Sequence, residues 1–163
     1  MNSLTFTAPW GKSLRWMSAF SIVFIITVSI VIRRVDQSPA SWLALWLPPV
    51  LLGGTALFLI REYTIDPREL LIQRLLWATR LPLAGLKSVT FQPGAMRGSF
   101  RLFGNGGMFS FTGWYRNRAL GIYRAFVTDL NKTVVLRFEK KTIVVSPENP
   151  ERFVAEIRSL INC

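Results

Sequence analysis

The sequence predicts an α+β protein in which a two-helix transmembrane hairpin precedes a small β-rich domain. Two uncharged segments, residues 16–32 and 42–60, lie near the N-terminus of a chain in which 50% of the residues are hydrophobic. Beyond residue 61 apolar residues alternate with polar ones in short segments separated by turn residues, a pattern typical of β-strands. We therefore expect residues 1–60 to form the hairpin and residues 61–163 to form a cytoplasmic domain.

The two uncharged segments have lengths suited to crossing a membrane. As helices they would span about 26 Å and about 28 Å, against a hydrocarbon thickness of roughly 30 Å. We expect helices over about residues 14–32 and 42–60, joined by a polar loop over residues 33–41. Tryptophans near the ends of both segments fit the preference of indole for the membrane interface.

A cleaved signal peptide and a buried hairpin of a soluble protein are the alternative interpretations. A signal peptide would have a shorter apolar region that ends at small residues, whereas the first segment ends at Arg33 and Arg34. Two adjacent uncharged segments with flanking arginines disfavour a soluble hairpin. Pro48-Pro49 interrupts the second segment, where a membrane helix tolerates it as a simple kink or uses it as a functional hinge.

The distribution of charge predicts that both termini lie in the cytoplasm. The loop between the predicted helices carries Arg33 and Arg34. The outer flanks carry more basic residues, namely Lys12, Arg15, Arg61, Arg68, Arg74 and Arg80. Since cytoplasmic segments retain Lys and Arg, we expect a multi-pass protein of the inner (plasma) membrane. The formal charge of +11 has two interpretations, this topology signal or an affinity for anionic partners.

About seven short strands are expected after the hairpin, as an antiparallel, partly open barrel. The candidate segments are residues 63–65, 69–76, 86–92, 100–103, 108–112, 122–128, 134–138 and 142–145. The glycine-rich residues 104–107 predict a hairpin turn. Apolar residues from Phe153 to Ile161 recur at three- and four-residue steps after the N-cap residue Asn149, which predicts a C-terminal helix covering an edge or opening of the sheet.

Three segments of this domain carry motifs that are informative together. Residues 101–109 contain the glycine-rich turn, residues 120–129 contain Leu-Gly-Ile-Tyr-Arg, and residues 143–153 end in Ser-Pro-Glu-Asn-Pro-Glu-Arg-Phe. In these segments the chain resembles bacterial pleckstrin-homology-like (PH-like) domains, over about residues 61–161. The resemblance implies a barrel of about seven strands with a C-terminal capping helix, often preceded by one or two membrane helices. It implies no particular ligand, and the Lys-x-Arg loop of lipid-binding PH domains is absent, since Arg68 stands alone in the first turn.

The composition excludes several classes of catalytic and metal site. Histidine is absent and Cys163 is the single cysteine, which excludes a His-based triad, the usual zinc sites and an internal disulfide. Gly104-Asn105-Gly106-Gly107 is followed by Met108 rather than by the Lys of a P-loop, which favours a hairpin turn. We therefore expect no enzymatic activity, no metal and no cofactor.

Basic and aromatic residues beyond residue 96 form the candidate interaction surface. They form either one face that contacts anionic headgroups or a set of dispersed, solvated cations. Trp114 and Tyr115 are expected in a loop after Gly113, as interfacial anchors or a protein-binding patch, and core positions are expected for Phe109 and Phe111. The candidate residues are Arg97, Arg101, Trp114, Tyr115, Arg116, Arg118, Arg124, Lys140 and Lys141.

These features together predict a non-enzymatic, membrane-anchored PH-like module. We expect it to contact a protein partner or anionic phospholipid headgroups at the inner face of the membrane, with the lipid bilayer itself as an integral partner. Nucleic acid is disfavoured as a partner. The second interpretation is a small membrane subunit of a larger transport or secretion assembly, in which the transmembrane helices carry the specificity.

Overall fold

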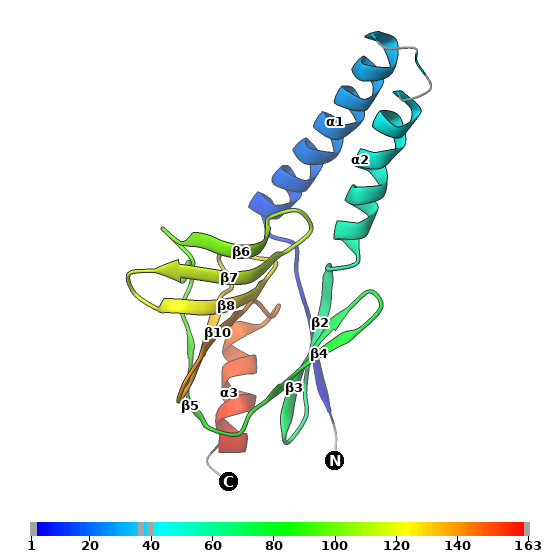
Figure 1. The fold of residues 1–163 in the computed structure, drawn as a ribbon. Helices are drawn as coiled ribbons and strands as arrows, with labels where there is room; N and C mark the ends of the chain where they lie inside the picture. The colour runs from blue at the N-terminus through cyan, green and yellow to red at the C-terminus, as the bar shows by residue number, and fades with distance from the viewer. Residues whose placement is uncertain (1–2, 36–37, 39–40, 162–163) are drawn as a thin grey trace.

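The computed structural model describes residues 3–35, 38 and 41–161, which form three helices and ten strands. The first two helices, α1 (Lys12–Val35) and α2 (Ser41–Ala56), extend as a pair from one end of a β-rich body (Figure 1). The third helix, α3 (Pro150–Ile161), packs against that body. The predicted α+β class and the predicted C-terminal helix are confirmed.

The smaller sheet holds four antiparallel strands in the order β1-β2-β3-β4. These strands are β1 (Leu4–Thr7), β2 (Ile60–Ile65), β3 (Glu69–Arg74) and β4 (Ala78–Pro82). Neither β1 nor β4 is predicted from the sequence, because each buries a single large apolar side chain, Phe6 and Leu81, and shows no extended alternation. Pairing of β1 with β2 places the segment before α1 beside the segment after α2.

The helix α1 begins inside the β-rich body and continues well beyond it. Leu14 in its first turn is fully buried in an apolar cluster beneath the larger sheet. Over the rest of its length most side chains are exposed, and only 11% of its most apolar 18-residue window is buried. Among the described residues, α1 is the one helix that is long and apolar enough to cross a membrane.

The second predicted transmembrane helix is shorter in the structure than residues 42–60. α2 has 16 residues, which corresponds to about 24 Å, less than the roughly 30 Å of a hydrocarbon core. It continues through Pro48-Pro49 and ends at Ala56, because residues 57–59 turn and Ile60 pairs with Arg74 in the sheet. A second membrane span is thus not established. Residues 36–37 and 39–40 of the predicted connecting loop lie outside the described residues.

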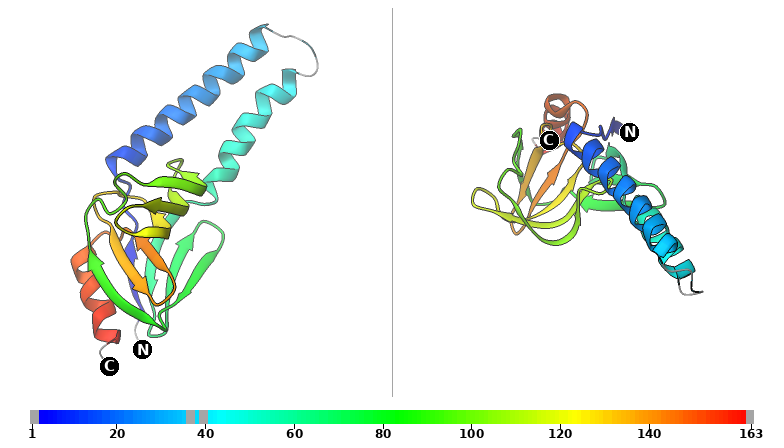
Figure 2. Two further views of the ribbon diagram at one scale, coloured as in Figure 1. Left: turned by 60° about the vertical axis from the view of Figure 1, so that its left-hand side comes forward. Right: turned by 90° about the horizontal axis from the view of Figure 1, so that it is seen from above.

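The larger sheet has the strand order β5-β9-β10-β8-β7-β6 (Figure 2). Its strands are β5 (Leu86–Phe91), β6 (Phe100–Gly106), β7 (Phe111–Asn117), β8 (Gly121–Val127), β9 (Val134–Phe138) and β10 (Thr142–Val145). The expectation of a wholly antiparallel sheet is wrong, because β10 runs parallel to β8. After β8 the chain crosses to β9 two positions away, and the β9–β10 hairpin then returns β10 beside β8 in the same direction.

The glycine-rich segment has a different role from the predicted one. Gly104 and Gly106 belong to β6, and the turn follows at residues 107–110. Gly104 lies opposite Gly113, with φ angles of 114° and 143°, and a Cβ on Gly113 would lie 2.1 Å from the carbonyl oxygen of Phe103. Glycine therefore permits a close backbone approach here. Consequently β7 runs through Trp114 and Tyr115, which the sequence analysis placed in a loop.

Two apolar clusters hold the β-rich body together. The first lies between the two sheets and is closed by Phe153, Val154 and Ile157 of α3. The second lies on the other face of the larger sheet, where Leu14 of α1 packs with core residues of that sheet. The start of α1 therefore belongs to the folded core, and so does the capping helix.

The buried hydroxyl of Tyr63 connects the two sheets. It donates a hydrogen bond to the backbone carbonyl of Phe126 at 2.7 Å and accepts one from the backbone N–H of Ser146 at 3.3 Å. Burial raises the pKa of Tyr63 to about 12. Because the folded state favours the neutral phenol, this contribution to stability is constant below about pH 10 and is lost as the pH rises towards 12.

Replacing Tyr63 should therefore reduce both stability and its alkaline pH dependence. We expect Tyr63→Phe to lower the free energy of unfolding by about 1 kcal/mol at neutral pH, because the Phe126 carbonyl loses its donor. We also expect a shallower loss of stability above about pH 10, and the remainder should come from Tyr115 and Tyr123, whose pKa values are also raised by burial. Denaturant unfolding of the full-length protein in mild detergent measures both. An unchanged alkaline decline in the variant would contradict this account.

Candidate functional site

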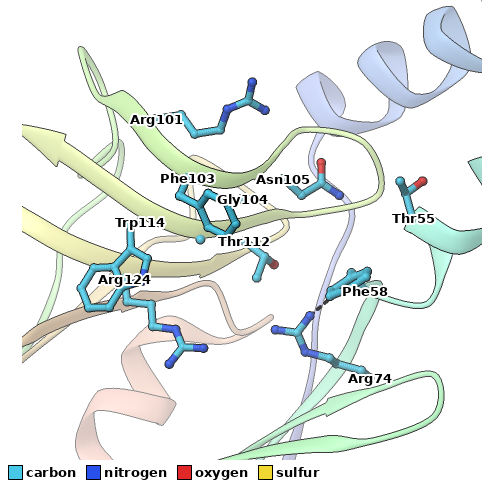
Figure 3. Close-up of a pocket in the computed structure, with 11 residues that line it drawn as sticks. Thr55, Phe58, Arg74, Arg101, Phe103, Gly104, Asn105, Thr112, Trp114 and Arg124 are labelled. Atoms are coloured by element: carbon cyan, nitrogen blue, oxygen red, sulfur yellow. Dashed lines mark hydrogen bonds between the residues drawn. The ribbon is translucent and has the colours of Figure 1, made fainter. Parts of the chain in front are cut away.

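A cavity of about 540 Å³ lies between the two sheets, at the end from which the helices extend (Figure 3). We call this cavity the junction pocket. The pocket is lined by the end of α2 and the residues after it, by β3, and by β6, β7 and β8 at one edge of the larger sheet. The lining residues are Thr55, Phe58, Arg74, Arg101, Phe103, Gly104, Asn105, Thr112, Gly113, Trp114 and Arg124.

Arg74 is a buried cation on one side of the junction pocket. It is the last residue of β3 and is 7% exposed, on the same face of the strand as the buried residues Leu70 and Ile72. Its guanidinium carbon lies 5.6 Å, 5.7 Å and 5.5 Å from the ring centroids of Phe58, Trp77 and Phe126. Three aromatic rings therefore surround the charge and stabilise it by cation–π interaction.

The hydrogen bonding of Arg74 is incomplete. Its Nη1 donates to the backbone carbonyl of Phe58 at 3.4 Å, and its Nε has no partner. The ion pairs found among the described residues do not include Arg74. Burial lowers the pKa of Arg74, and the nearby charge of Arg124 lowers it further. An arginine still keeps its proton, so this side chain is a buried charge without an anion beside it.

Arg124 brings a second cation into the junction pocket from the opposite side. It lies on β8, directly across from Trp114 on β7. Its guanidinium carbon is 4.9 Å from the centroid of the Phe126 ring, the same ring that Arg74 approaches. Figure 3 shows the two guanidinium groups directed into the pocket from opposite sides. Two like charges therefore converge above one aromatic ring.

The neutral polar side chains of the pocket are already hydrogen-bonded within the protein. Asn105 bonds both the backbone N–H and the carbonyl of Met108. Thr112 is bonded to Ser110, and Thr55 donates to the carbonyl of Leu52 at 2.7 Å. The other walls are aromatic, formed by Phe58, Phe103 and Trp114. The free bonding capacity of the pocket is therefore cationic, in an otherwise apolar setting.

The turn between β6 and β7 attaches both helices to this region. Ser18 of α1 contacts it twice: its Oγ lies 3.5 Å from the carbonyl of Gly107 and accepts a hydrogen bond from the N–H of Phe109 at 3.1 Å. On the α2 side, Ser110 donates to the carbonyl of Phe58 at 3.2 Å. Phe109 has a positive φ of 63° and contacts the ring of Trp10, so it is a turn residue, in contrast to Phe111, which is buried as predicted.

The structure brings together only part of the predicted interaction surface. Arg101, Trp114 and Arg124 meet at the junction pocket, and Arg116 lies on the same face of β7 as Trp114. Tyr115 points to the opposite face, is 5% exposed and donates to the carbonyl of Asn105, so its prediction as a surface anchor is wrong.

The other predicted basic residues lie elsewhere. Arg97 precedes β6 in a turn, and Arg118 lies in the turn between β7 and β8. Lys140 and Lys141 lie at the turn between β9 and β10, which both views of the β-rich body place at the end away from the helices (Figures 1 and 2). These two lysines therefore share no face with the junction pocket.

Sequence reasoning missed Arg74 and Phe58 as site residues. Phe58 was assigned to a membrane helix, and Arg74 was counted only as a topology signal. A signal for Arg74 was present, because Leu70, Ile72 and Arg74 continue one period-two pattern, and the arginine therefore falls on the buried face of the strand. A charged residue at such a position is a marker of a functional site.

The described residues offer no cluster of metal ligands. Within residues 3–35, 38 and 41–161, no group of three or more Asp, Glu, Cys or His side chains is placed to hold an ion. The guanidinium groups and aromatic walls of the junction pocket are suited to anions and to apolar groups.

Comparison with known families assigns the β-rich part of the chain. The family model described as "Bacterial PH domain" matches residues 61–161, which is more than half of the sequence. The chain belongs to the bacterial PH domain family. The match begins after Ile60, so β1, α1 and α2 lie outside the PH domain as the family defines it, even though β1 completes its first sheet. No curated protein and no solved structure matches the chain.

Removing the charge of Arg74 should not destabilise this PH domain. We expect Arg74→Met to unfold at the same or a higher denaturant concentration than the wild type, because an apolar side chain avoids the desolvation cost of an unpaired buried charge. Denaturant unfolding of delipidated full-length protein in a nonionic detergent measures this.

The matched control is Ile72→Ala, two residues earlier on the same buried face of β3. This variant should lose about 2–5 kcal/mol of unfolding free energy through cavity formation. A loss of similar size in Arg74→Met would show that Arg74 is a structural residue.

Proposed function

We propose that this chain is a non-enzymatic, membrane-anchored PH module that works at the inner face of the membrane. In this proposal α1 spans the bilayer with α2 beside it, both termini lie in the cytoplasm, and the β-rich body contacts anionic headgroups. The single observation that carries the proposal is α1, a 24-residue apolar helix most of whose side chains are exposed. An apolar helix of this length is stable in water only when something covers it.

Exposed apolar side chains beside the end of α2 and along β6 and β7 support membrane contact by the body itself. We call the following set the collar: Phe58, Leu75, Leu76, Trp77, Phe100, Leu102, Phe103 and Trp114. Leu76, Phe103 and Phe100 are 71%, 77% and 80% exposed. The turn that carries Trp77 lies beside the end of α2, where Trp77 contacts Phe58 at 5.3 Å. Figure 1 shows β6 as the strand of the larger sheet nearest the helices. Aromatic side chains in such a position favour the membrane interface.

Basic residues beside the collar support contact with anionic lipid. Arg101, Arg116 and Arg124 lie on β6, β7 and β8, and the whole chain has a formal charge of +11. Each basic residue held near an anionic leaflet contributes about 1 kcal/mol of attraction. The family assignment is consistent with a binding module.

A second candidate function is that of a small subunit whose helices bind within a larger membrane assembly. The observation that favours it is the exposed apolar side of α2, including Leu43, Trp46 and Val50. Because α2 is too short to span a bilayer unaided, this candidate function has another protein pack against its exposed apolar side. In that case the specificity would lie in the helices rather than in the PH domain.

The membrane topology can be tested through Cys163, the single cysteine of the sequence. We expect the full-length protein to remain in the membrane fraction after an alkaline wash. We also expect a membrane-impermeant maleimide to label Cys163 in inside-out vesicles but not in intact spheroplasts. Release by the alkaline wash would refute the integral anchor, and labelling in intact spheroplasts would refute the cytoplasmic C-terminus.

The headgroup contact can be tested with the full-length protein in nanodiscs. Replacing part of the phosphatidylcholine by phosphatidylglycerol should raise the unfolding temperature of the wild type. The double variant Arg101→Glu/Arg116→Glu should lose most of this increase, since its reversed charges repel the anionic leaflet. The control Lys140→Glu/Lys141→Glu carries the same charge change at the far end of the body. Equal responses of the two double variants would contradict contact through this face.

A further inference from the structure

The junction pocket contains a buried positive charge that no anion of the described residues neutralises. Arg74 is 7% exposed, has no carboxylate partner among the described residues, and has an Nε without a hydrogen bond. Burying a charge without a counterion costs folding free energy. Folded proteins retain such a charge where it serves binding or catalysis. The convergence of Arg124 on the same Phe126 ring adds repulsion between like charges. An anion between the two arginines would remove both costs.

The chemistry of the pocket narrows the class of anion. A guanidinium presents parallel N–H donors that match the oxygens of phosphate or carboxylate, and two guanidinium groups facing one another suit a group with several oxygens, such as phosphate. The neutral polar side chains of the pocket are already hydrogen-bonded to other parts of the protein, namely Leu52, Met108 and Ser110. The ligand is therefore recognised by its negative charge, and a neutral polar ligand would find few partners.

The walls and the position of the pocket identify what carries the phosphate. Phe58, Phe103 and Trp114 give the pocket aromatic walls, which suit an apolar part of the ligand. Thr55 and Phe58 place one side of the pocket at the end of α2, so a lipid beside that helix would have its headgroup at this level. A freely soluble phosphate would leave the aromatic walls unused.

We propose that the junction pocket binds the phosphate of an anionic membrane lipid between Arg74 and Arg124, with the lipid chain leaving along the aromatic walls towards α2. This inference rests on the proposed membrane attachment and adds to it a single saturable site. The pocket lies at the opposite end of β2 and β3 from the turn at Arg68, because Ile60 pairs with Arg74 at one end and Ile65 pairs with Leu70 at the other.

The test measures binding to delipidated full-length protein in a nonionic detergent. The probes are short-chain (dihexanoyl) phosphatidylglycerol, dihexanoyl phosphatidylcholine and inorganic phosphate. Native mass spectrometry reports stoichiometry, and the shift in unfolding temperature reports affinity. We expect one phosphatidylglycerol per chain, binding by phosphatidylcholine that is at least about tenfold weaker, and no shift with millimolar phosphate.

Two pocket variants and one control locate the site. Arg124→Gln should weaken phosphatidylglycerol binding by roughly 10- to 100-fold, the range expected for loss of charged hydrogen bonds. Arg74→Gln should do the same. Arg137→Gln removes an exposed arginine from β9, away from the pocket, and should bind as the wild type does. Because Arg124 is exposed, its replacement should leave the fold intact, and the inference stays testable even if Arg74→Gln unfolds.

Three outcomes would overturn the inference. Equal binding by Arg124→Gln and Arg137→Gln would show that the lipid does not occupy the pocket. Inorganic phosphate binding as tightly as phosphatidylglycerol would assign the site to a soluble oxyanion. Equal binding of phosphatidylglycerol and phosphatidylcholine would show that the net charge of the lipid does not determine binding. If any of these occurs while the alkaline wash and the nanodisc results hold, the pocket assignment fails and the proposed function stands.

Discussion

The pairing of β1 with β2 is the constraint on which the rest of the structure depends. Leu4–Thr7 precede α1 and pair with residues 62–65, which follow α2. The segment that contains the two helices therefore leaves the sheet and returns to it at the same edge. The backbone N–H of Ala8 continues this connection to the carbonyl of Arg61 at 2.9 Å, and that of Gly11 bonds to the carbonyl of Thr128 at 3.0 Å. The helix pair is therefore an insertion in the sheet rather than a flexible tether.

This attachment explains why the junction pocket lies where it does. Ile60 ends the connection from α2 and pairs with Arg74, which places the arginine directly beneath Phe58. The β6–β7 turn closes the other side by bonding to Ser18 of α1 and to the carbonyl of Phe58. The two sheets and the segment after α2 thus meet around one buried cation, with α1 attached through the β6–β7 turn. A ligand in the pocket would contact the end of α2, β3 and the edge of the larger sheet, and the β6–β7 turn would connect that site to α1.

The sequence predicts local patterns well and long-range pairing poorly. The amphipathic C-terminal helix, the β-rich class and the family were recognisable, because periodicity, capping at Asn149 and the motifs of residues 101–153 are local signals. β1 was missed because its four residues gain their stability from pairing with β2 about sixty positions away. For the same reason the candidate surface was only partly right. Tyr115 was placed on the wrong face because the strand pairing around Gly104 and Gly113 sets its orientation.

The central claim is that the collar lies at the bilayer interface while the opposite end of the body lies in water. Spin labels at Leu76→Cys and Lys141→Cys, each in a Cys163→Ser background, test it in full-length protein reconstituted into bilayers. Accessibility to oxygen, which concentrates in the membrane, is compared with accessibility to an aqueous nickel chelate. The account predicts that the label at position 76 favours oxygen and that the label at position 141 favours the chelate. Equal, aqueous accessibility at both positions would contradict it.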